Sequence, residues 1–147
     1  MDRTQAQALL SEFGTLTGLP DVELDEAGIG TFVVDDNILV SVGFDDLAGR
    51  LVLMATLDQC ETGPAQMTAM LQANFLWRGA GGASFALTPN GDTAVLLFPV
   101  PVDANAIALS VIVQSFIDVI ETWQKRLAAI DVGSEPAVVP LASAVWG

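Results

Sequence analysis

The chain has 147 residues, with 18 acidic and 5 basic side chains, a single Cys, no His and a formal net charge of −13. This length fits one domain of ordinary size. Hydrophobic residues make up 52% of the chain and charged residues only 16%. The chain can therefore bury a core, and the excess of apolar residues predicts a surface that another chain covers.

The composition excludes several classes of function. Five cations are too few to neutralise a nucleic-acid backbone, so we expect no nucleic-acid partner. The absence of His excludes Ser-His-Asp and Cys-His relays and imidazole metal ligands. Cys60 alone forms neither a thiolate zinc site nor an intramolecular disulfide, which suits a reducing cytoplasm. We expect no cofactor and no bound metal.

The sequence also predicts no stable membrane insertion. Its first residues lack the basic and apolar regions of a signal peptide. The apolar stretch 94–102 contains two prolines and is far shorter than the roughly 20 residues that span a bilayer.

The first predicted element is an amphipathic helix over residues 4–16. Apolar residues recur there at steps of three and four, and Thr4 is the expected N-cap, with Gln7 at the capping-box position. Gly18 and Pro20 are expected to end the helix.

Three strands are predicted next. Residues 29–34 and 38–44 are rich in β-branched residues and are separated by the polar segment 35–37, which is typical of a hairpin. A second polar turn then leads to a strand over 50–57. Sequential neighbours of this kind favour an antiparallel meander.

In the second half of the chain, the spacing of apolar residues changes twice between helical and strand-like. Pro64 begins a predicted helix that continues to about Trp77. Strands are predicted over 83–87 and 93–98, on either side of a Pro-Asn-Gly-Asp turn. The last helix has the clearest apolar stripe, which consists of Leu109, Val113, Phe116, Ile120, Trp123, Leu127 and Ile130.

The predicted order is thus helix, three strands, helix, two strands, helix. This order favours an α+β domain over residues 1–130, in which helices pack on one face of an antiparallel sheet. Residues 131–147 are rich in small residues and Pro, and we expect an irregular C-terminal tail.

Candidate catalytic groups are few. The pairs Asp35-Asp36 and Asp45-Asp46 are carboxylate clusters, but neighbouring strand residues point to opposite faces and Asp favours turns. Cys60 has no cation near it in sequence to activate its thiol. A binding module is therefore favoured, because the edge of an open sheet and neighbouring apolar hollows accept an extended peptide.

Three segments carry a resemblance to a known family. The first is Leu9-Leu10-Ser-Glu-Phe13-Gly14-Thr-Leu16-Thr-Gly18-Leu19-Pro20, and the second is Met70-Leu71-Gln-Ala-Asn74. The third runs from Gly82-Ala-Ser-Phe85 through Asn90-Gly91-Asp92 to Val95-Leu96-Leu97, with Phe116 and Trp123 further on. In this order they resemble the class I type III secretion chaperones related to the Tir chaperone, the CesT-like family, over about residues 5–128.

The resemblance implies a homodimer in the bacterial cytoplasm, without catalysis, that keeps a virulence effector soluble and competent for secretion. Such a chaperone binds the N-terminal, non-globular segment of the effector. The implied partner-binding residues are Leu9, Phe13, Phe32, Val34, Val40, Val42, Leu51 and Leu53. The implied dimerisation residues are Met67, Met70, Leu71, Phe75 and Trp77.

Three alternatives stay open at this point. A regulatory chaperone that sequesters a cytoplasmic regulator of secretion uses the same fold. In a purely structural homo-oligomer, contacts between copies of the chain bury all of the excess apolar surface. A carboxylate-dependent enzyme would use Asp35, Asp36 or Asp58.

Overall fold

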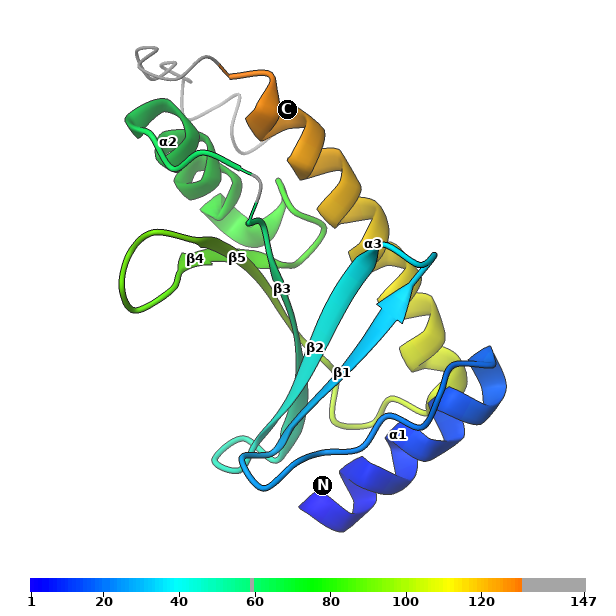
Figure 1. Cartoon of the computed structure of the whole chain (residues 1–147). Helices are drawn as coiled ribbons and strands as arrows, with labels where there is room; N and C mark the ends of the chain where they lie inside the picture. The colour runs from blue at the N-terminus through cyan, green and yellow to red at the C-terminus, as the bar shows by residue number, and fades with distance from the viewer. Residues whose placement is uncertain (59, 131–147) are drawn as a thin grey trace. The chain divides into compact units, whose positions relative to one another are not determined.

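The computed structural model describes residues 1–58 and 60–130 (Figure 1). The elements follow the predicted order and confirm the α+β class. They are α1 (Arg3–Thr17), β1 (Ile29–Val34), β2 (Ile38–Asp45), β3 (Arg50–Thr56), α2 (Pro64–Ala73), the short 3₁₀ helix η1 (Phe75–Trp77), β4 (Ser84–Leu87), β5 (Ala94–Pro99) and α3 (Ala106–Ala128).

The five strands form one sheet in the order β1-β2-β3-β5-β4, which makes β1 and β4 its edge strands. The pairs β1–β2, β2–β3 and β4–β5 are antiparallel. The chain divides into two compact units, the first made of residues 1–55 and 98–117 and the second of the remaining residues. The single domain over 1–130 stays a prediction, and the predicted tail, 131–147, lies outside the described residues.

In the first unit, α1 begins one residue earlier than expected, and its cap lies two residues before the predicted one. Its N-cap is Asp2, whose carboxylate accepts the backbone N–H of Gln5 at 2.8 Å, while the Gln5 side chain accepts the N–H of Asp2 at 2.9 Å. The predicted cap, Thr4, lies inside the first turn, because the capping box sits two residues nearer the N-terminus. Gly18 ends the helix at φ 72°, as expected.

The strands of the first unit bury one face. The predicted hairpin is confirmed, and its turn places Asp35 and Asp36 at positive φ. Phe32 pairs with Val40 across the hairpin, and the Phe13 ring meets the Phe32 ring edge-on at 5.5 Å. The apolar side chains of this face, together with α1, form the core of this unit.

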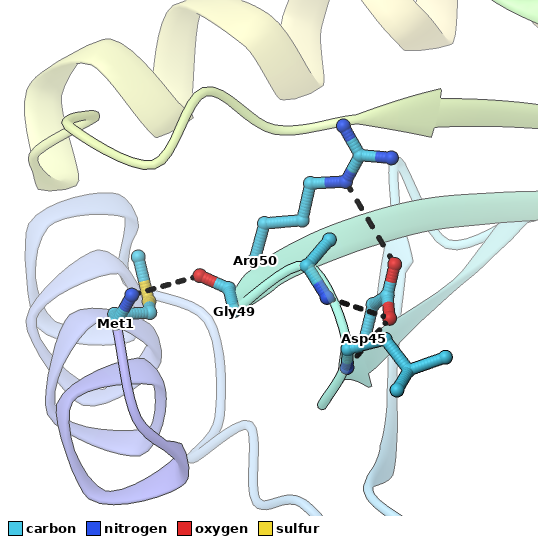
Figure 2. A network of polar contacts seen from close by, with 6 residues as sticks. Met1, Asp45, Gly49 and Arg50 are labelled. Atoms are coloured by element: carbon cyan, nitrogen blue, oxygen red, sulfur yellow. Dashed lines mark hydrogen bonds and ion pairs between the residues drawn. The ribbon is translucent and has the colours of Figure 1, made fainter.

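The turn between β2 and β3 is organised by a single carboxylate (Figure 2). Asp45 accepts the backbone N–H groups of Leu47 and Ala48 at 3.1 and 3.2 Å and lies 3.9 Å from Nε of Arg50. The terminal ammonium of Met1 donates to the carbonyl of Gly49 at 2.8 Å and ties the start of α1 to this turn. Asp45 thus has a structural role in the turn.

In the second unit, α2 ends earlier than predicted. The helix stops at Ala73, and the predicted extension to Trp77 is wrong, because Leu76 and Trp77 adopt positive φ values of 55° and 58° within the short 3₁₀ helix η1. Trp123 of α3 donates its indole N–H to the carbonyl of Gly79 at 3.0 Å. Its ring packs edge-on against Phe85 of β4 at 4.8 Å, which joins strand and helix in the core of this unit.

The apolar stripe of α3 is buried as predicted, except that its last member, Ile130, is half-exposed. By length and composition alone α3 is apolar enough to cross a membrane. The core helix of a soluble protein passes the same test; in α3 the stripe is buried, whereas Ile107 and Val111 are 66% and 63% exposed.

Candidate protein-binding surfaces

The residues that sequence implied for partner binding lie together in the core of the first unit. Seven of the eight are buried, and only Val34 is partly exposed. Val40, Val42, Leu51 and Leu53 are each at most 1% exposed. In this conformation a partner cannot reach these side chains, and their part in binding stays a prediction.

The opposite face of the same strands carries exposed apolar side chains. Val33 and Leu39 are register partners on β1 and β2 and are 47% and 57% exposed, and Ile29 is 41% exposed. Val52 and Met54 of β3 are half-buried on this face. We call these five residues the outer sheet face. Alternation in the sequence marks both faces of these strands, and the residues implied for partner binding lie on the other face.

The free edge of β1 adjoins the outer sheet face. Antiparallel pairing points the N–H and C=O groups of alternate residues away from the partner strand. In β1 these outward residues are Ile29, Thr31 and Val33, because Gly28 bonds to Phe44 and the pairing alternates from there. Asp25 occupies the outward groups of Ile29, with bonds of 2.9 and 3.0 Å. Within the described residues, the outward groups of Thr31 and Val33 have no hydrogen-bond partner.

The edge of β4 is closed at its centre by one side chain. The Asn74 amide donates to the carbonyl of Phe85 at 3.0 Å and accepts the N–H of Phe85 at 2.7 Å. These are the two groups that another strand would need. An incoming strand therefore finds unpaired groups along β1, whereas the middle of β4 is already bonded.

The second unit carries two apolar hollows beside α2. The larger, about 800 Å³, includes Leu71, Phe75, Gly79, Trp123, Arg126 and Ile130 in its lining, and we call it the α2–α3 groove. The smaller, about 260 Å³, is lined by Met67, Met70, Leu71, Phe85, Ala86 and Leu87, and we call it the α2–β4 hollow. Leu71 is common to both and is 70% exposed.

The residues implied for dimerisation are distributed around these hollows. Met67, Met70 and Leu71 line the α2–β4 hollow, although Met70 is only 3% exposed. Phe75 lines the α2–α3 groove. Trp77 lines neither, but its side chain is 61% exposed. The structure thus gathers four of the five around apolar hollows.

A third apolar hollow lies in the first unit. It measures about 470 Å³ and lies between α1 and the start of α3, with Leu16 and Ile107 in its lining. These two side chains are 53% and 66% exposed. The sequence does not indicate this hollow, because Leu16 continues the apolar spacing of α1.

The described residues offer little catalytic chemistry. Residues 1–58 and 60–130 contain no group of three or more metal-ligating side chains. Burial raises the pKa of the Cys60 thiol, which lowers the fraction of reactive thiolate at neutral pH. The surfaces that stand out are apolar hollows and an unpaired strand edge, which suit binding of another polypeptide.

Comparison with known proteins assigns the family. A sequence model of the Tir chaperone protein (CesT) family matches residues 8–124. No curated protein matches the chain significantly.

Solved structures share the fold at low sequence identity. The ExsC–ExsE complex matches with a TM-score of 0.73 and 21% identity, over 89% of this chain and 100% of the other. The HopA1–SchA chaperone–effector complex matches with a TM-score of 0.68 and 15% identity, over 85% and 98% of the two chains. The Yersinia pestis type III secretion chaperone SycH, solved with a stable fragment of YscM2, matches with a TM-score of 0.63 and 23% identity, over 80% and 98%.

The family match covers well over half of the chain, and the order of elements, the antiparallel strand pairs and the solved relatives agree with it. The chain belongs to the Tir chaperone (CesT) family.

Proposed function

We propose that the protein is a homodimeric chaperone of the bacterial cytoplasm. It binds the N-terminal, non-globular segment of a type III secreted effector and keeps that segment soluble and competent for secretion. Family membership supports the chaperone role. The observation that carries the proposal is the pairing of an open β1 edge with an exposed apolar outer sheet face.

An extended effector segment would add to β1. Its backbone would bond to the outward groups of Thr31 and Val33, and alternate side chains would rest on Val33 and Leu39. Ordering a flexible segment costs conformational entropy, which burial of its apolar side chains offsets. The segment would stay extended as long as it is bound. The buried residues of the same strands would act indirectly, by holding β1 and β2 in register.

Dimerisation would use the α2–β4 hollow. Three residues of its lining are implied for dimerisation, and Leu71 is the most exposed of them. The other two, Met67 and Met70, have side chains that adapt to irregular surfaces. Because Asn74 occupies the centre of the β4 edge, the two copies would meet through side chains rather than by pairing β4 strands.

The dimer is tested by Leu71→Asp. The added carboxylate would have to be buried without a partner, so we expect the variant to be monomeric in sedimentation equilibrium at concentrations at which the parent protein is dimeric. The matched control is Leu47→Asp, at a fully exposed Leu in the β2–β3 turn, which should leave the dimer intact. A dimeric Leu71→Asp variant with native circular dichroism would contradict the assigned interface.

The effector role is tested by capture from the parent bacterium. We expect two copies of the chain bound to one secreted protein, and deletion of the N-terminal region of that protein should abolish the complex. Recovery of a non-secreted regulator as the main partner would replace escort by regulation. Recovery of a bare oligomer under secreting conditions would indicate a purely structural role.

A further inference from the structure

The α2–α3 groove is the larger of the two hollows beside α2, about 800 Å³ against about 260 Å³. One wall is formed by Leu71 and Phe75, which are 70% and 39% exposed. The other wall is formed by Trp123, Arg126 and Ile130 from the end of α3 and the residues that follow it. The groove lies entirely within the second unit.

The chain itself continues from the wall of this groove. Ile130 lines the groove and is the last residue that the structure describes before the segment 131–147. A segment attached at the groove has a high effective concentration there, on the order of millimolar for a short flexible connection. Seventeen residues reach up to about 56 Å at roughly 3.3 Å per residue.

The composition of this segment suits the groove. Nine of its seventeen residues are apolar, namely Val132, Ala137, Val138, Val139, Leu141, Ala142, Ala144, Val145 and Trp146. Its only charged residues are Asp131 and Glu135, and it has no cation.

The charges of segment and groove are complementary. Arg126, on the groove wall, lies 5.1 Å from the centroid of the Trp123 ring. Glu135 is five residues beyond Ile130, within about 16 Å of extended chain, so its carboxylate can reach the Arg126 guanidinium.

We propose that the occupant of the α2–α3 groove is the chain's own segment 131–147. Val138, Val139 and Leu141 cover Phe75, and Glu135 pairs with Arg126. The segment thereby covers apolar surface on the second unit while leaving the β1 edge free for a partner. The inference does not depend on the proposed effector or on the proposed dimer.

The test is paramagnetic broadening in the full-length chain. Cys60→Ser removes the native thiol, and Ser143→Cys then carries a nitroxide label on a ¹⁵N-labelled chain. We expect the amide signals of groove residues such as Ala69, Leu71 and Gln72 to have at most half of the intensity that they have after the nitroxide is reduced. The signals of Ser41 and Val42, in the first unit, report non-specific broadening.

A second variant tests the chemistry of the contact. Val139→Asp places a carboxylate against the apolar wall and should restore the groove signals, whereas Ser134→Asp adds the same charge at a polar position and should not. Both changes lie in the segment, so the described core is untouched.

A mixed sample separates the sources of broadening. When ¹⁵N chains without a label are mixed with an excess of labelled ¹⁴N chains, a segment bound within its own chain gives less broadening at the groove than is seen in the chain that carries its own label. Broadening in the mixed sample that is as strong as in that chain would assign the groove to the segment of another copy and overturn the proposal. Equal broadening of both units, or none at the groove, would overturn it as well.

Discussion

Asn74 is the residue that distinguishes the two edges of the sheet. Its amide makes both hydrogen bonds that a neighbouring strand would make to Phe85. The sequence pattern placed Asn74 inside a helix that continued to Trp77, because Phe75 falls at helical spacing. A single side chain that prefers to bond to backbone outside the helix ended it instead.

Asn74→Ala should destabilise the fold. The change leaves the N–H and C=O of Phe85 without their partners, and the free energy of unfolding should fall by about 1–3 kcal/mol. Urea denaturation measures this loss. Asn37→Ala, at an exposed position in the β1–β2 turn, is the control and should change stability by no more than about 0.5 kcal/mol. An equal loss in both variants would show that the amide does not support β4.

Cys60 gives a prediction for pH. Burial raises the pKa of its thiol, so the folded protein keeps the proton at a pH at which the unfolded chain releases it. The thiol therefore does not change the free energy of unfolding below the pKa of the unfolded thiol. Above it, the free energy of unfolding falls as the pH rises through the folded pKa. Alkylation of the native protein by iodoacetamide should reach half its maximal rate at a higher pH than alkylation in urea. A lower midpoint in the native protein would mean an activated thiol.

At the scale of elements, alternation predicted the strands but not which face is covered. Phe32 and Val33 are neighbours in β1, yet Phe32 is 5% exposed and Val33 is 47% exposed. Period two divides a strand into two faces, and here both faces are apolar. The covered face follows from tertiary packing, such as the ring of Phe13 against Phe32. For this reason the residues implied for binding fell into the core.

Thr31→Pro tests the edge of β1. Proline removes the outward N–H of Thr31 and is tolerated on an edge strand, because that N–H does not bond to β2. We expect native circular dichroism and a loss of effector affinity of at least about tenfold, or about 1.4 kcal/mol, in calorimetry. Thr31→Val keeps the N–H and should bind like the parent protein. Unchanged affinity of the proline variant would exclude the β1 edge as the binding site of the effector.

At the scale of the whole molecule, the order of helices and strands was predictable because local signals agreed with one another. Gly18, Pro64 and the Asn90-Gly91 turn each fall where the structure changes element. The hollows were not predictable, because each collects side chains from elements far apart in sequence, such as Leu71 and Trp123.

The net charge of −13 predicts how salt acts on the proposed dimer. Two copies repel each other, and salt screens this repulsion with a Debye length of about 10 Å at 0.1 M. Raising NaCl from about 20 to about 300 mM should therefore lower the dimer dissociation constant several-fold, as measured by sedimentation equilibrium. The same salt change should slow association with a basic effector segment, because that attraction is screened too. A dimer that weakens with salt would point to ion pairs between the copies.

The blocked edge of β4 also limits aggregation by pairing of strand edges. A sheet with two open edges is a polymerisation unit, since each added copy presents a fresh edge and growth never terminates. Here the Asn74 amide occupies the middle of one edge, so copies that pair by strands are left with β1 against β1. Pairing through strand edges alone therefore ends at two molecules, because neither copy then keeps a fully open edge.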